Sequence, residues 1–392
     1  MIINLASLLS PAGEKSFFEH FVSKSRMHVQ SDDRRRAESL LPWDSINRLL
    51  ESDVLRGNNL KLVRANRVIP PIMYRKSDEA NRIDPRAFYS LLPQGVSIVI
   101  DLIDEYVPDL ARLADSLERR LAHKVWINCY ISFGPGKAFK PHWDNHDVII
   151  VQVHGSKRWR SFGVPDPPPT RKHRDSDPVP TGVVWEGAMR AGDILYLPRG
   201  EVHEADLEAG DSAHLTIGIQ PRRGIDFWAW LGEQASSESI FRTDLTRHQG
   251  DAAMYEHEHE ARLKARMHAL IESSSLGAFL DSDDTQAPLR RRVSLGIVDR
   301  VAHDTLVVPA IRRRVAIDLS SPDVERVAIG GEQFDLSAIA RRVIDFLGAA
   351  DAQSLGTIAA ALQGYADDKG VREAVCELAR LGLVGLESHD SR

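Results

Sequence analysis

The segment from Val125 to Ile219 limits the possible folds of this chain more than any other part of it. Short apolar stretches follow one another here, separated by Gly, Pro and Asp residues. A series of short strands with frequent turns is typical of an antiparallel barrel or jelly roll. Stretches with apolar residues at helical spacing flank the segment on both sides. We therefore expect an α+β protein with a jelly-roll core and flanking helices.

Two residues of metal-binding type precede an apolar run within this segment. His142 and Asp144 stand just before the run from Val148 to Val153. In an extended chain, residues i and i+2 face the same side, so this imidazole and this carboxylate can point at one spot. They make two thirds of a facial triad, the ligand set typical of Fe(II) sites with open coordination positions. A single His-x-Asp step is more often a surface pair beside a strand, so the assignment needs a third ligand.

His203 is the candidate for that third ligand. It follows the strand-like stretch AGDILYL, residues 191–197, and a Pro-Arg-Gly turn. A His just past a strand and a turn is well suited to complete such a site. The order His-x-Asp followed by a distant His predicts one metal site made by His142, Asp144 and His203.

The motifs taken together resemble the JmjC-type, cupin-fold 2-oxoglutarate oxygenases, and within them the ribosomal oxygenase branch, which hydroxylates ribosomal proteins. The resemblance rests on the stretches WINCYISFGPG, PHWDNHDVIIVQVHGSKRWR, GDILYLPRGEVHEAD and AHLTIGI. It is close over residues 128–220 and loose elsewhere. It implies a double-stranded β-helix core. It also implies Fe(II) bound by His142, Asp144 and His203, with 2-oxoglutarate and dioxygen as cosubstrates.

The resemblance also implies a residue that binds the cosubstrate. In that family a basic residue fifteen positions after the first His holds the distal carboxylate of 2-oxoglutarate, and Lys157 stands at this position. A carboxylate buried in a barrel needs a paired charge. The spacing favours Lys157 over Arg158, and an ordinary surface Lys is the alternative. We expect Gly155 and Ser156 to form a turn, after which KRWRSF begins a second short strand.

Three further residues are polar positions in otherwise apolar strands: Asn128, Tyr130 and Thr216. Buried polar groups need hydrogen-bond partners. In the resembling family, residues at these positions contact 2-oxoglutarate, whereas a satisfied hydrogen bond in the core is the alternative. Four histidines stay unassigned: His146, His154, His173 and His214.

We expect three parts in the chain. Residues 1–225 form the catalytic domain with its N-terminal helices, and residues 226–285 form a helical region. Residues 286–392 resemble a winged helix that follows a linker at 282–288, with RRRVAIDL, residues 312–319, as one of its strands. Trp228, Trp230 and a Leu/Met/Ile stripe give the helical region more apolar surface than a lone helix pair can hide. We therefore expect a homodimer through this region.

Two further segments invite a functional interpretation. Residues 165–182 form a Pro-rich polar loop whose length is unusual for an inert connection, although a solvated insertion has about even odds. The HEHE run, residues 257–260, lacks a second His at the spacing that a zinc-protease helix needs. We therefore expect it to be a solvated helix face.

Composition bounds the compartment and the partners. The chain has two Cys residues, Cys129 and Cys376, without a CxxC pair, which excludes a disulfide framework and fits a reducing cytoplasm. No apolar run approaches the ~18 residues that span a bilayer, so we expect no membrane helix. The net charge is −6, and residues 290–392 hold 14 Arg and Lys against 15 Asp and Glu. We therefore expect no direct DNA binding.

Three hypotheses of function remain. The first is a hydroxylase of a protein or peptide, with a ribosomal protein side chain as its target. The second is an oxygenase of the same fold that acts on a biosynthetic precursor peptide or removes N-methyl groups. The third is a cupin that binds metal without turnover, which the intact set of His142, Asp144, His203 and Lys157 disfavours. The iron ligands do not separate the first two hypotheses, because both need the same site.

Overall fold

The computed structural model describes residues 4–31, 33–52, 54–55, 59–76, 82–134, 139–165, 182–245, 253–348 and 350–388. The chain divides into two compact units, Met1–Pro221 and Arg222–Arg392. The expected boundary at residue 225 stays a prediction. The further division at residue 285 stays a prediction. Most of the Pro-rich loop expected at 165–182 lies outside the described residues.

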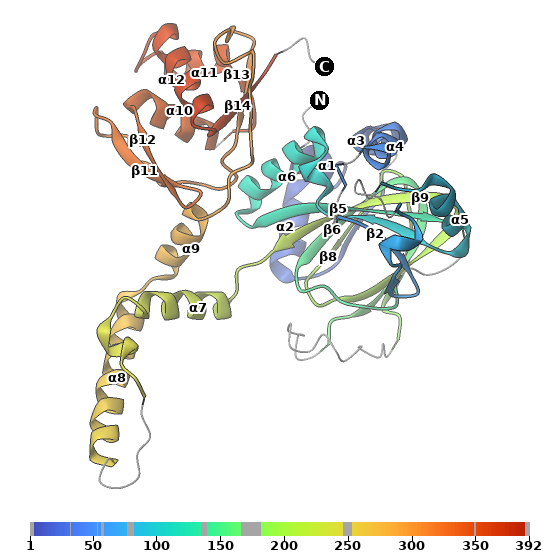
Figure 1. Cartoon of the computed structure of the whole chain (residues 1–392), viewed down its shortest axis with the longest axis horizontal. Coiled ribbons are helices and arrows are strands. Elements are labelled where there is room, and N and C mark those ends of the chain that lie inside the picture. The colour runs from blue at the N-terminus through green and yellow to red at the C-terminus, as the bar shows by residue number, and fades with distance from the viewer. Residues whose placement is uncertain are drawn as a thin grey trace. The chain divides into compact units, whose positions relative to one another are not determined.

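A nine-stranded antiparallel sheet forms the centre of the first unit (Figure 1). The order of neighbouring strands is β1-β8-β6-β9-β5-β4-β2-β3, and β7 pairs with β6. The strands are β1 (Met27–Val29), β2 (Leu60–Arg64), β3 (Arg67–Val68), β4 (Ser97–Ile100), β5 (Lys124–Phe133), β6 (Asp147–Gly163), β7 (Trp185–Arg190), β8 (Ile194–Leu197) and β9 (Val202–Gln220). The curled antiparallel sheet and its helices agree with the expected α+β fold.

Helices cover one face of this sheet and share the main apolar core with it. The helices are α1 (Leu5–Leu8), α2 (Gly13–Ser23), α3 (Arg34–Leu40), α4 (Trp43–Glu51), α5 (Pro85–Leu91) and α6 (Pro108–Leu121). Among the described residues, short 3-10 turns accompany them: η2 (Pro71–Met73), η3 (Leu92–Gln94) and η4 (Ile103–Glu105). On α6, the leucines at helical spacing are buried, as the pattern predicts.

The strands alternate between the helix-covered core and the interior of the sheet. On β5, Ile127, Cys129 and Ile131 are fully buried in the core. The alternate residues of β5, among them Tyr130, face the interior, because side chains in a strand point to opposite sides in turn. A second, smaller apolar cluster fills part of this interior, made by Val148, Ile150, Trp159, Met189, Leu195 and Leu197. The polar residues that the sequence singled out lie on the interior side.

The expected turn at Gly155 and Ser156 is not a turn, because β6 continues through both residues. The ladder between β6 and β9 shifts its register here, as in a β-bulge. Gly155 has φ +63°, and a Cβ on it would stand 2.0 Å from the carbonyl oxygen of Asp211. A bulge changes which residues face inward. Ile150 lines the pocket before it, and Lys157 lines the pocket after it.

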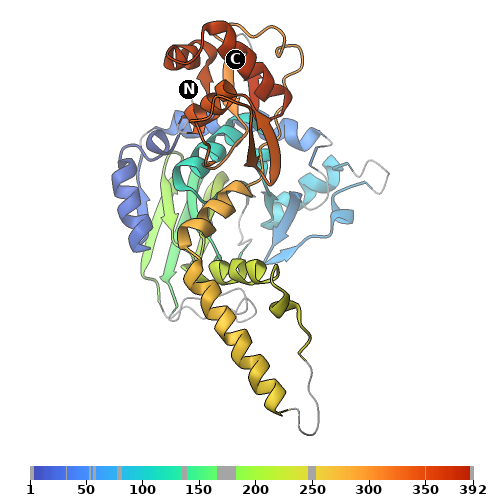
Figure 2. The same cartoon turned by 90° about the vertical axis from the view of Figure 1, so that its left-hand side faces the viewer.

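The helical part of the second unit contains α7 (Gly224–Ala235), η6 (Ser239–Arg242), α8 (Ala253–Ser273) and α9 (Leu276–Thr285) (Figure 2). The expected linker at 282–288 begins too early, because α9 continues to Thr285. The acidic residues that indicated a linker are engaged in ion pairs. Asp283 and Asp284 both bind Arg222, and Asp283 also binds Arg313. None of the described helices is long and apolar enough to cross a membrane.

The remainder of the second unit has its own apolar core. Its elements are β10 (Leu306–Pro309), β11 (Glu325–Ile329), β12 (Glu332–Leu336), α10 (Ala338–Gly348), β13 (Gln353–Ser354), α11 (Leu355–Leu362), α12 (Asp368–Arg380) and β14 (Val384–Glu387). The strands expected around Gly330 and Gly331 are present as the hairpin β11-β12. The winged-helix likeness stays a prediction.

The strand expected at 312–319 does not form. The buried guanidinium of Arg341 binds the carbonyl oxygens of Asp318, Ser321 and Asp323. These carbonyls accept from a side chain instead of a neighbouring strand, so the stretch beside them is held as a loop.

Candidate metal centre and its pocket

The three predicted metal ligands lie together at one end of the interior. His142 precedes β6, and His203 stands at the start of β9. The two residues form an antiparallel bridge, with backbone N–H to O distances of 3.0 and 2.8 Å. The backbone N–H of Gly200 donates to the carbonyl oxygen of Asp144 at 2.9 Å, which joins the two ligand segments again.

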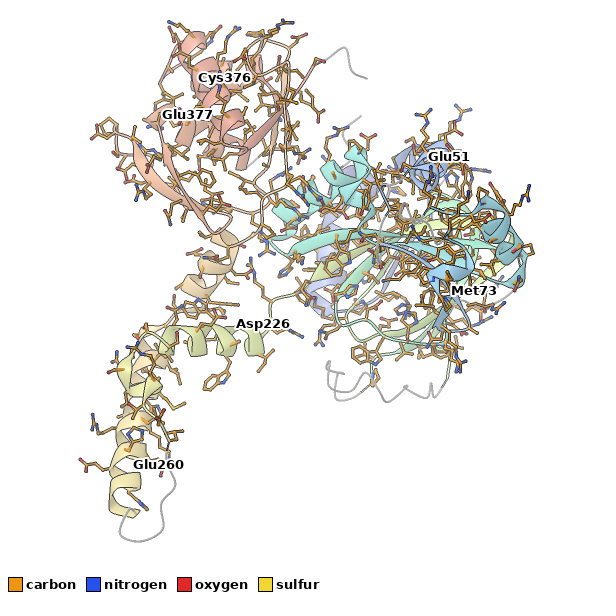
Figure 3. The ribbon with its side chains drawn as sticks, in the orientation of Figure 1. Glu51, Met73, Asp226, Glu260, Cys376 and Glu377 are labelled. Atoms are coloured by element: carbon orange, nitrogen blue, oxygen red, sulfur yellow. The ribbon has the colours of Figure 1, made fainter. Side chains whose placement is uncertain are left out.

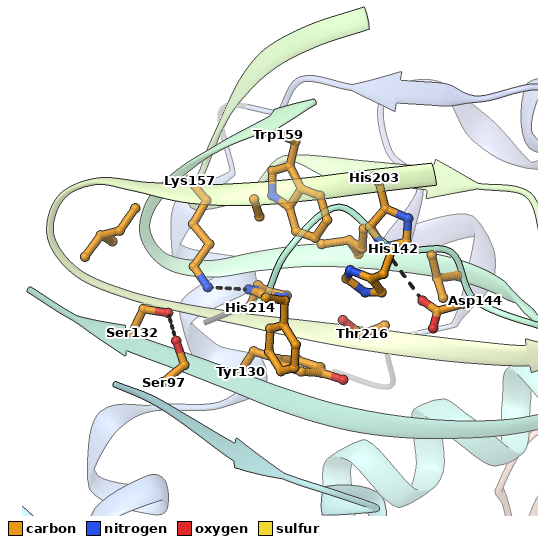
Figure 4. A pocket seen from close by; sticks show the side chains of 15 residues that line it. Ser97, Tyr130, Ser132, His142, Asp144, Lys157, Trp159, His203, His214 and Thr216 are labelled. Atoms are coloured by element: carbon orange, nitrogen blue, oxygen red, sulfur yellow. Dashed lines mark hydrogen bonds and ion pairs between the residues drawn. The ribbon is translucent and has the colours of Figure 1, made fainter. Parts of the chain in front are cut away.

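The side chains of these three residues point at a common position (Figure 4). One ligand atom from each of His142, Asp144 and His203 lies within 4.8 Å of the other two. The Nε2 atom of His203 is 3.7 Å from a carboxylate oxygen of Asp144. Within the described ranges of the chain, this is the only group of three or more His, Cys, Asp or Glu residues that could hold a metal ion.

Backbone carbonyls fix the tautomers of both histidines. The Nδ1 atom of His142 is 2.9 Å from the carbonyl oxygen of Lys140, and Nδ1 of His203 is 2.9 Å from that of Glu201. A carbonyl oxygen can only accept, so Nδ1 carries the proton and Nε2 keeps a free lone pair. Burial, with His142 nearby, lowers the pKa of His203 to about 4. The donor set therefore fits a divalent cation: two neutral imidazoles and one carboxylate, oriented by outer hydrogen bonds.

The HEHE run on α8 agrees with a solvated face. Glu260 forms an ion pair with Lys264 one helical turn further on, and Figure 3 shows Glu260 on the outside of α8. His257 and Glu258 are exposed.

The metal centre opens into a pocket that continues along the interior of the sheet. The residues that line it are Ser97, Tyr130, Ser132, Phe139, His142, Asp144, Val148, Ile150, Lys157, Trp159, His203, Ala205, Leu207, His214 and Thr216. In Figure 4 the three metal-ligand candidates lie at one end and Lys157 at the other. Apolar side chains from β6 and β9 separate the two ends. The pocket therefore offers a cation at one end and a metal site at the other.

Lys157 is a buried cation without a carboxylate partner among the described residues. Its side chain is 5% exposed, and Nζ lies 3.2 Å from Nδ1 of His214. Burial lowers the pKa of Lys157 to about 8. A buried ammonium group is stable only with a compensating partner. An anionic ligand that reaches this end of the pocket would supply one.

Of the other three residues predicted to contact 2-oxoglutarate, two line the pocket and one does not. Tyr130 and Thr216 line the pocket, and the ring of Tyr130 stacks on His214 with centroids 5.1 Å apart. Asn128 stands opposite Thr216 in the ladder but does not line the pocket. Its Oδ1 atom accepts a hydrogen bond from the backbone N–H of Leu102 at 2.9 Å. Asn128 is half-buried and Leu102 is 41% exposed, so this hydrogen bond is not in the core, and the contact of Asn128 with 2-oxoglutarate stays a prediction.

Four pocket residues with hydrogen-bonding side chains were not assigned from the sequence: His214, Trp159, Ser97 and Ser132. Strand alternation is the signal that finds three of them. His214 stands two residues before Thr216, Trp159 stands two residues after Lys157, and Ser132 stands two residues after Tyr130. The hydroxyl groups of Ser97 and Ser132 are 2.7 Å apart across β4 and β5.

The other unassigned histidines do not line the pocket or lie outside the described residues. His154 stacks on Trp43 with centroids 4.7 Å apart, and its Nε2 atom lies 2.8 Å from the carbonyl oxygen of Leu41. His146 packs on Trp126 with centroids 4.7 Å apart. His173 lies outside the described residues.

Comparisons with known proteins agree with this fold. The JmjC domain family matches residues 103–227. The mouse protein Ribosomal oxygenase 2 is 26% identical over 216 residues, which are 54% of this chain and 46% of the mouse protein. A Drosophila mojavensis protein, the bifunctional lysine-specific demethylase and histidyl-hydroxylase NO66, is 25% identical over 218 residues. These residues are 54% of this chain and 24% of that protein. The chain thus spans less than half the length of either relative.

A solved structure extends the likeness of fold to nearly the whole chain. It is the ribosomal oxygenase YcfD from Escherichia coli in complex with cobalt and 2-oxoglutarate, with a TM-score of 0.61 and 16% identity. The likeness covers 95% of this chain and 98% of that chain. The fold and the three-ligand site define a cupin-fold protein with a JmjC domain, as the motifs predicted. Within this class, the relatives that the chain is similar to include ribosomal oxygenases and a histidyl-hydroxylase.

Proposed function

We propose that this protein is a 2-oxoglutarate- and Fe(II)-dependent oxygenase that hydroxylates a side chain of a ribosomal protein. One observation carries the proposal: the buried cation of Lys157 and the cluster of His142, Asp144 and His203 line the same pocket. A dicarboxylate with a 2-oxo group needs these two features at opposite ends. Its distal carboxylate needs a buried cation, and its other end needs a metal with open positions.

Each part of the pocket has a role in this proposal. The Nε2 atoms of His142 and His203, with the Asp144 carboxylate, hold Fe(II). When bound, the iron with 2-oxoglutarate and dioxygen supplies the oxidising chemistry that converts a C–H group into C–OH. Lys157 holds the distal carboxylate, and the hydroxyl groups of Tyr130 and Thr216 donate hydrogen bonds to the same ligand. Asn128 does not line the pocket, so its role is indirect. Its Oδ1 atom accepts the backbone N–H of Leu102 and so holds β5 beside the segment that follows β4.

The protein also keeps the Lys157 end of the pocket dry. Val148, Ile150 and Trp159 lie between the two ends and are at most 5% exposed. Their apolar surface keeps water away from the cation, so its attraction for a carboxylate is stronger than in water. Burial raises the pKa of the Tyr130 phenol, with Asp144 adding to the effect. The phenol therefore stays protonated and can donate.

The relatives support this proposal and suggest the class of substrate. The E. coli protein was solved with cobalt, a common stand-in for iron, and with 2-oxoglutarate. The mouse and E. coli proteins both carry the name ribosomal oxygenase. We extend the substrate class from these proteins to this chain as part of the proposal. The two cysteines are free, which is consistent with action in the cytoplasm, where ribosomes are found.

Intact-mass measurement of ribosomal proteins tests the proposal. Cells with and without the gene should differ by the mass of one oxygen on at least one ribosomal protein, with unmodified protein in the cells that lack the gene. The purified enzyme should restore the modification only with Fe(II) and 2-oxoglutarate present. If no ribosomal protein changes mass while the enzyme still consumes 2-oxoglutarate, the substrate is another peptide.

Demethylation is the second candidate function, because the Drosophila relative carries both activities in its name. The same metal site would hydroxylate an N-methyl group, which then leaves as formaldehyde. A methylated peptide would lose the mass of CH2 and release formaldehyde, whereas a hydroxylated peptide would gain one oxygen. The two products separate the functions in a single mass spectrum.

We also propose a homodimer through the helical region of residues 226–285. Phe227, Trp230 and Phe279 pack together, with centroids 5.6 to 6.0 Å apart. In contrast, Trp228 is 54% exposed and Leu276 is 59% exposed. Burial of these side chains in an interface would stabilise the dimer by roughly 25 cal/mol per Å² of apolar surface.

Light scattering of the purified protein at micromolar concentration should therefore give the mass of two chains. Trp228→Glu should shift the mass toward one chain, because a carboxylate at the interface would be desolvated without a partner. Val68→Glu is the matched control, since Val68 is 57% exposed on β3 in the other unit. It should leave the dimer intact. A wild-type mass of one chain under these conditions would contradict the prediction.

A further inference from the structure

Two cations in the N-terminal segment reach the two stretches that carry the metal-ligand candidates. Lys24 ends α2, and Arg26 precedes β1. Lys24 Nζ lies 2.6 Å from a carboxylate oxygen of Asp147, at the start of β6. A guanidinium nitrogen of Arg26 lies 2.5 Å from a carboxylate oxygen of Glu201. Each ligand stretch therefore has one ion pair to a segment that is remote in the sequence.

Lys24 forms its ion pair with Asp147, whose carboxylate connects the two ligand stretches. The Asp147 side chain is fully buried. One of its oxygens binds Lys24, and the other accepts the backbone N–H of Arg199 at 2.7 Å. Arg199 belongs to the turn that leads into His203. Asp147 therefore holds the stretch of Asp144 against this turn, and Lys24 compensates the charge of Asp147.

Arg26 forms its ion pair with Glu201, the residue whose carbonyl group orients His203. The Glu201 side chain is 5% exposed and also accepts a hydrogen bond from the Ser161 hydroxyl. Arg26 itself donates to that hydroxyl at 3.1 Å. The backbone carbonyl of the same Glu201 accepts the Nδ1 proton of His203 at 2.9 Å. Glu201 is thus fixed through its side chain while its main chain sets the ring of a ligand.

Among the described residues, Arg26 is the cation that pairs with Glu201. Removing one partner of a buried ion pair leaves the other charge buried and uncompensated, which is strongly destabilising. The Glu201 side chain would have to turn toward solvent, and its carbonyl group would move with the main chain. His203 would then lose the hydrogen bond that fixes its tautomer and its direction.

We propose that Arg26, assisted by Lys24, is a positioning residue of the metal site. The ion pair to Glu201 holds the carbonyl group that presents Nε2 of His203 to the metal. This inference rests on the proposed function in one respect, namely that His142, Asp144 and His203 bind a divalent cation.

Titration with Co(II) tests the proposal, with the visible absorption of the bound ion and calorimetry as readouts. Arg26→Ala should weaken Co(II) binding about 10- to 100-fold, the usual effect of removing an outer partner of a ligand. Arg26→Lys should recover part of the affinity, because it restores a cation but not the planar geometry of the guanidinium group. Arg120→Ala is the matched control. Arg120 binds Glu14 at 2.8 Å, joins α2 to α6 and touches neither ligand stretch. This variant should bind Co(II) like the wild type.

The titration separates positioning from a mere contribution to stability. Thermal unfolding of each metal-free variant shows whether it is fully folded at the titration temperature. A fully folded protein with an intact site keeps its affinity, because binding is weakened only by the fraction of unfolded chains. If Arg26→Ala does not fold, Arg26→Gln takes its place, since it keeps a donor and most of the side-chain volume.

The possible outcomes are distinct. A folded Arg26 variant that binds Co(II) as tightly as the wild type, with an unchanged spectrum, overturns the positioning role and leaves the proposed function intact. An equal loss in Arg120→Ala overturns it too, since the effect would then be general. A wild-type protein that binds no Co(II) overturns the proposed metal site itself.

Discussion

Asp144→Ala is expected to reduce the conversion of 2-oxoglutarate to succinate to the background rate. Asp144 is the only anionic member of the three-ligand cluster. Its loss leaves two neutral imidazoles, too few and too weakly charged to hold Fe(II) in place. The main-chain hydrogen bond from Gly200 to residue 144 does not involve the side chain. The fold should therefore survive, so that lost turnover reports on the metal.

Succinate release and iron content, measured on the same preparation, check this prediction. Asp109→Ala is a suitable control, because Asp109 is an exposed carboxylate in the first turn of α6. It should retain full activity and full iron content. An Asp144→Ala protein that turns over 2-oxoglutarate at the wild-type rate would show that the ligand assignment is wrong.

Lys157→Ala is expected to raise the half-saturating concentration of 2-oxoglutarate by two to three orders of magnitude. Removing one partner of a buried ion pair costs roughly 3–5 kcal/mol, because the other charge stays buried and uncompensated. Each ~1.4 kcal/mol corresponds to a factor of ten in affinity. Lys157 is not a metal ligand, so iron binding should be nearly unchanged. Lys157→Arg should retain part of the affinity, since it keeps the charge but changes the geometry.

Arg158→Ala is the matched control for Lys157. The side chain of Arg158 points to the opposite face of β6, where it pairs with Glu186 and Glu208. Its removal should leave the requirement for 2-oxoglutarate unchanged. If Lys157→Ala has no effect on half-saturation and Arg158→Ala does, the two roles are reversed.

The same cation predicts a dependence on pH. Burial lowers the pKa of Lys157 to about 8 in the ligand-free protein. Below this pH the ammonium group is charged and binds the carboxylate. As the pH rises through 8 the charge is lost, so half-saturation should increase by up to about tenfold per pH unit. In Lys157→Arg this increase should disappear, because a guanidinium stays charged. Titrations of 2-oxoglutarate at pH 7 and pH 9 with both proteins measure the effect.

Much of the candidate site was readable in the sequence, because its signals are local or depend on strand alternation. His142 and Asp144 are two residues apart in the stretch before β6, and this spacing brings them to one side in any extended chain. The glycine, proline and apolar pattern from Val125 to Ile219 predicted the antiparallel core in the same way. The helix α6 and the hairpin β11-β12 followed from helical spacing and from a Gly-Gly turn.

The predictions of local structure that were wrong concern segments in which a residue distant in the sequence overrides the local conformational preference. Gly155 and Ser156 carry the signature of a turn. In the structure, the glycine instead lies in a bulge. A side chain would not fit there, because the carbonyl group of Asp211 on a neighbouring strand leaves no room for a Cβ. The expected strand at 312–319 is a loop because Arg341 takes carbonyls beside it. Neither partner is close in the sequence.

The sequence by itself determined the residue types of the site, their order along the chain and the class of fold that brings them together. It did not determine which way β6 faces beyond Gly155. Only the bulge turns Lys157, rather than Arg158, into the pocket, and a one-residue shift reverses the faces of a strand. Tertiary structure alone also decided that Lys157 meets His214 and that Arg26 reaches Glu201. These contacts join residues far apart in the chain, so they exist only after the sheet has closed around them.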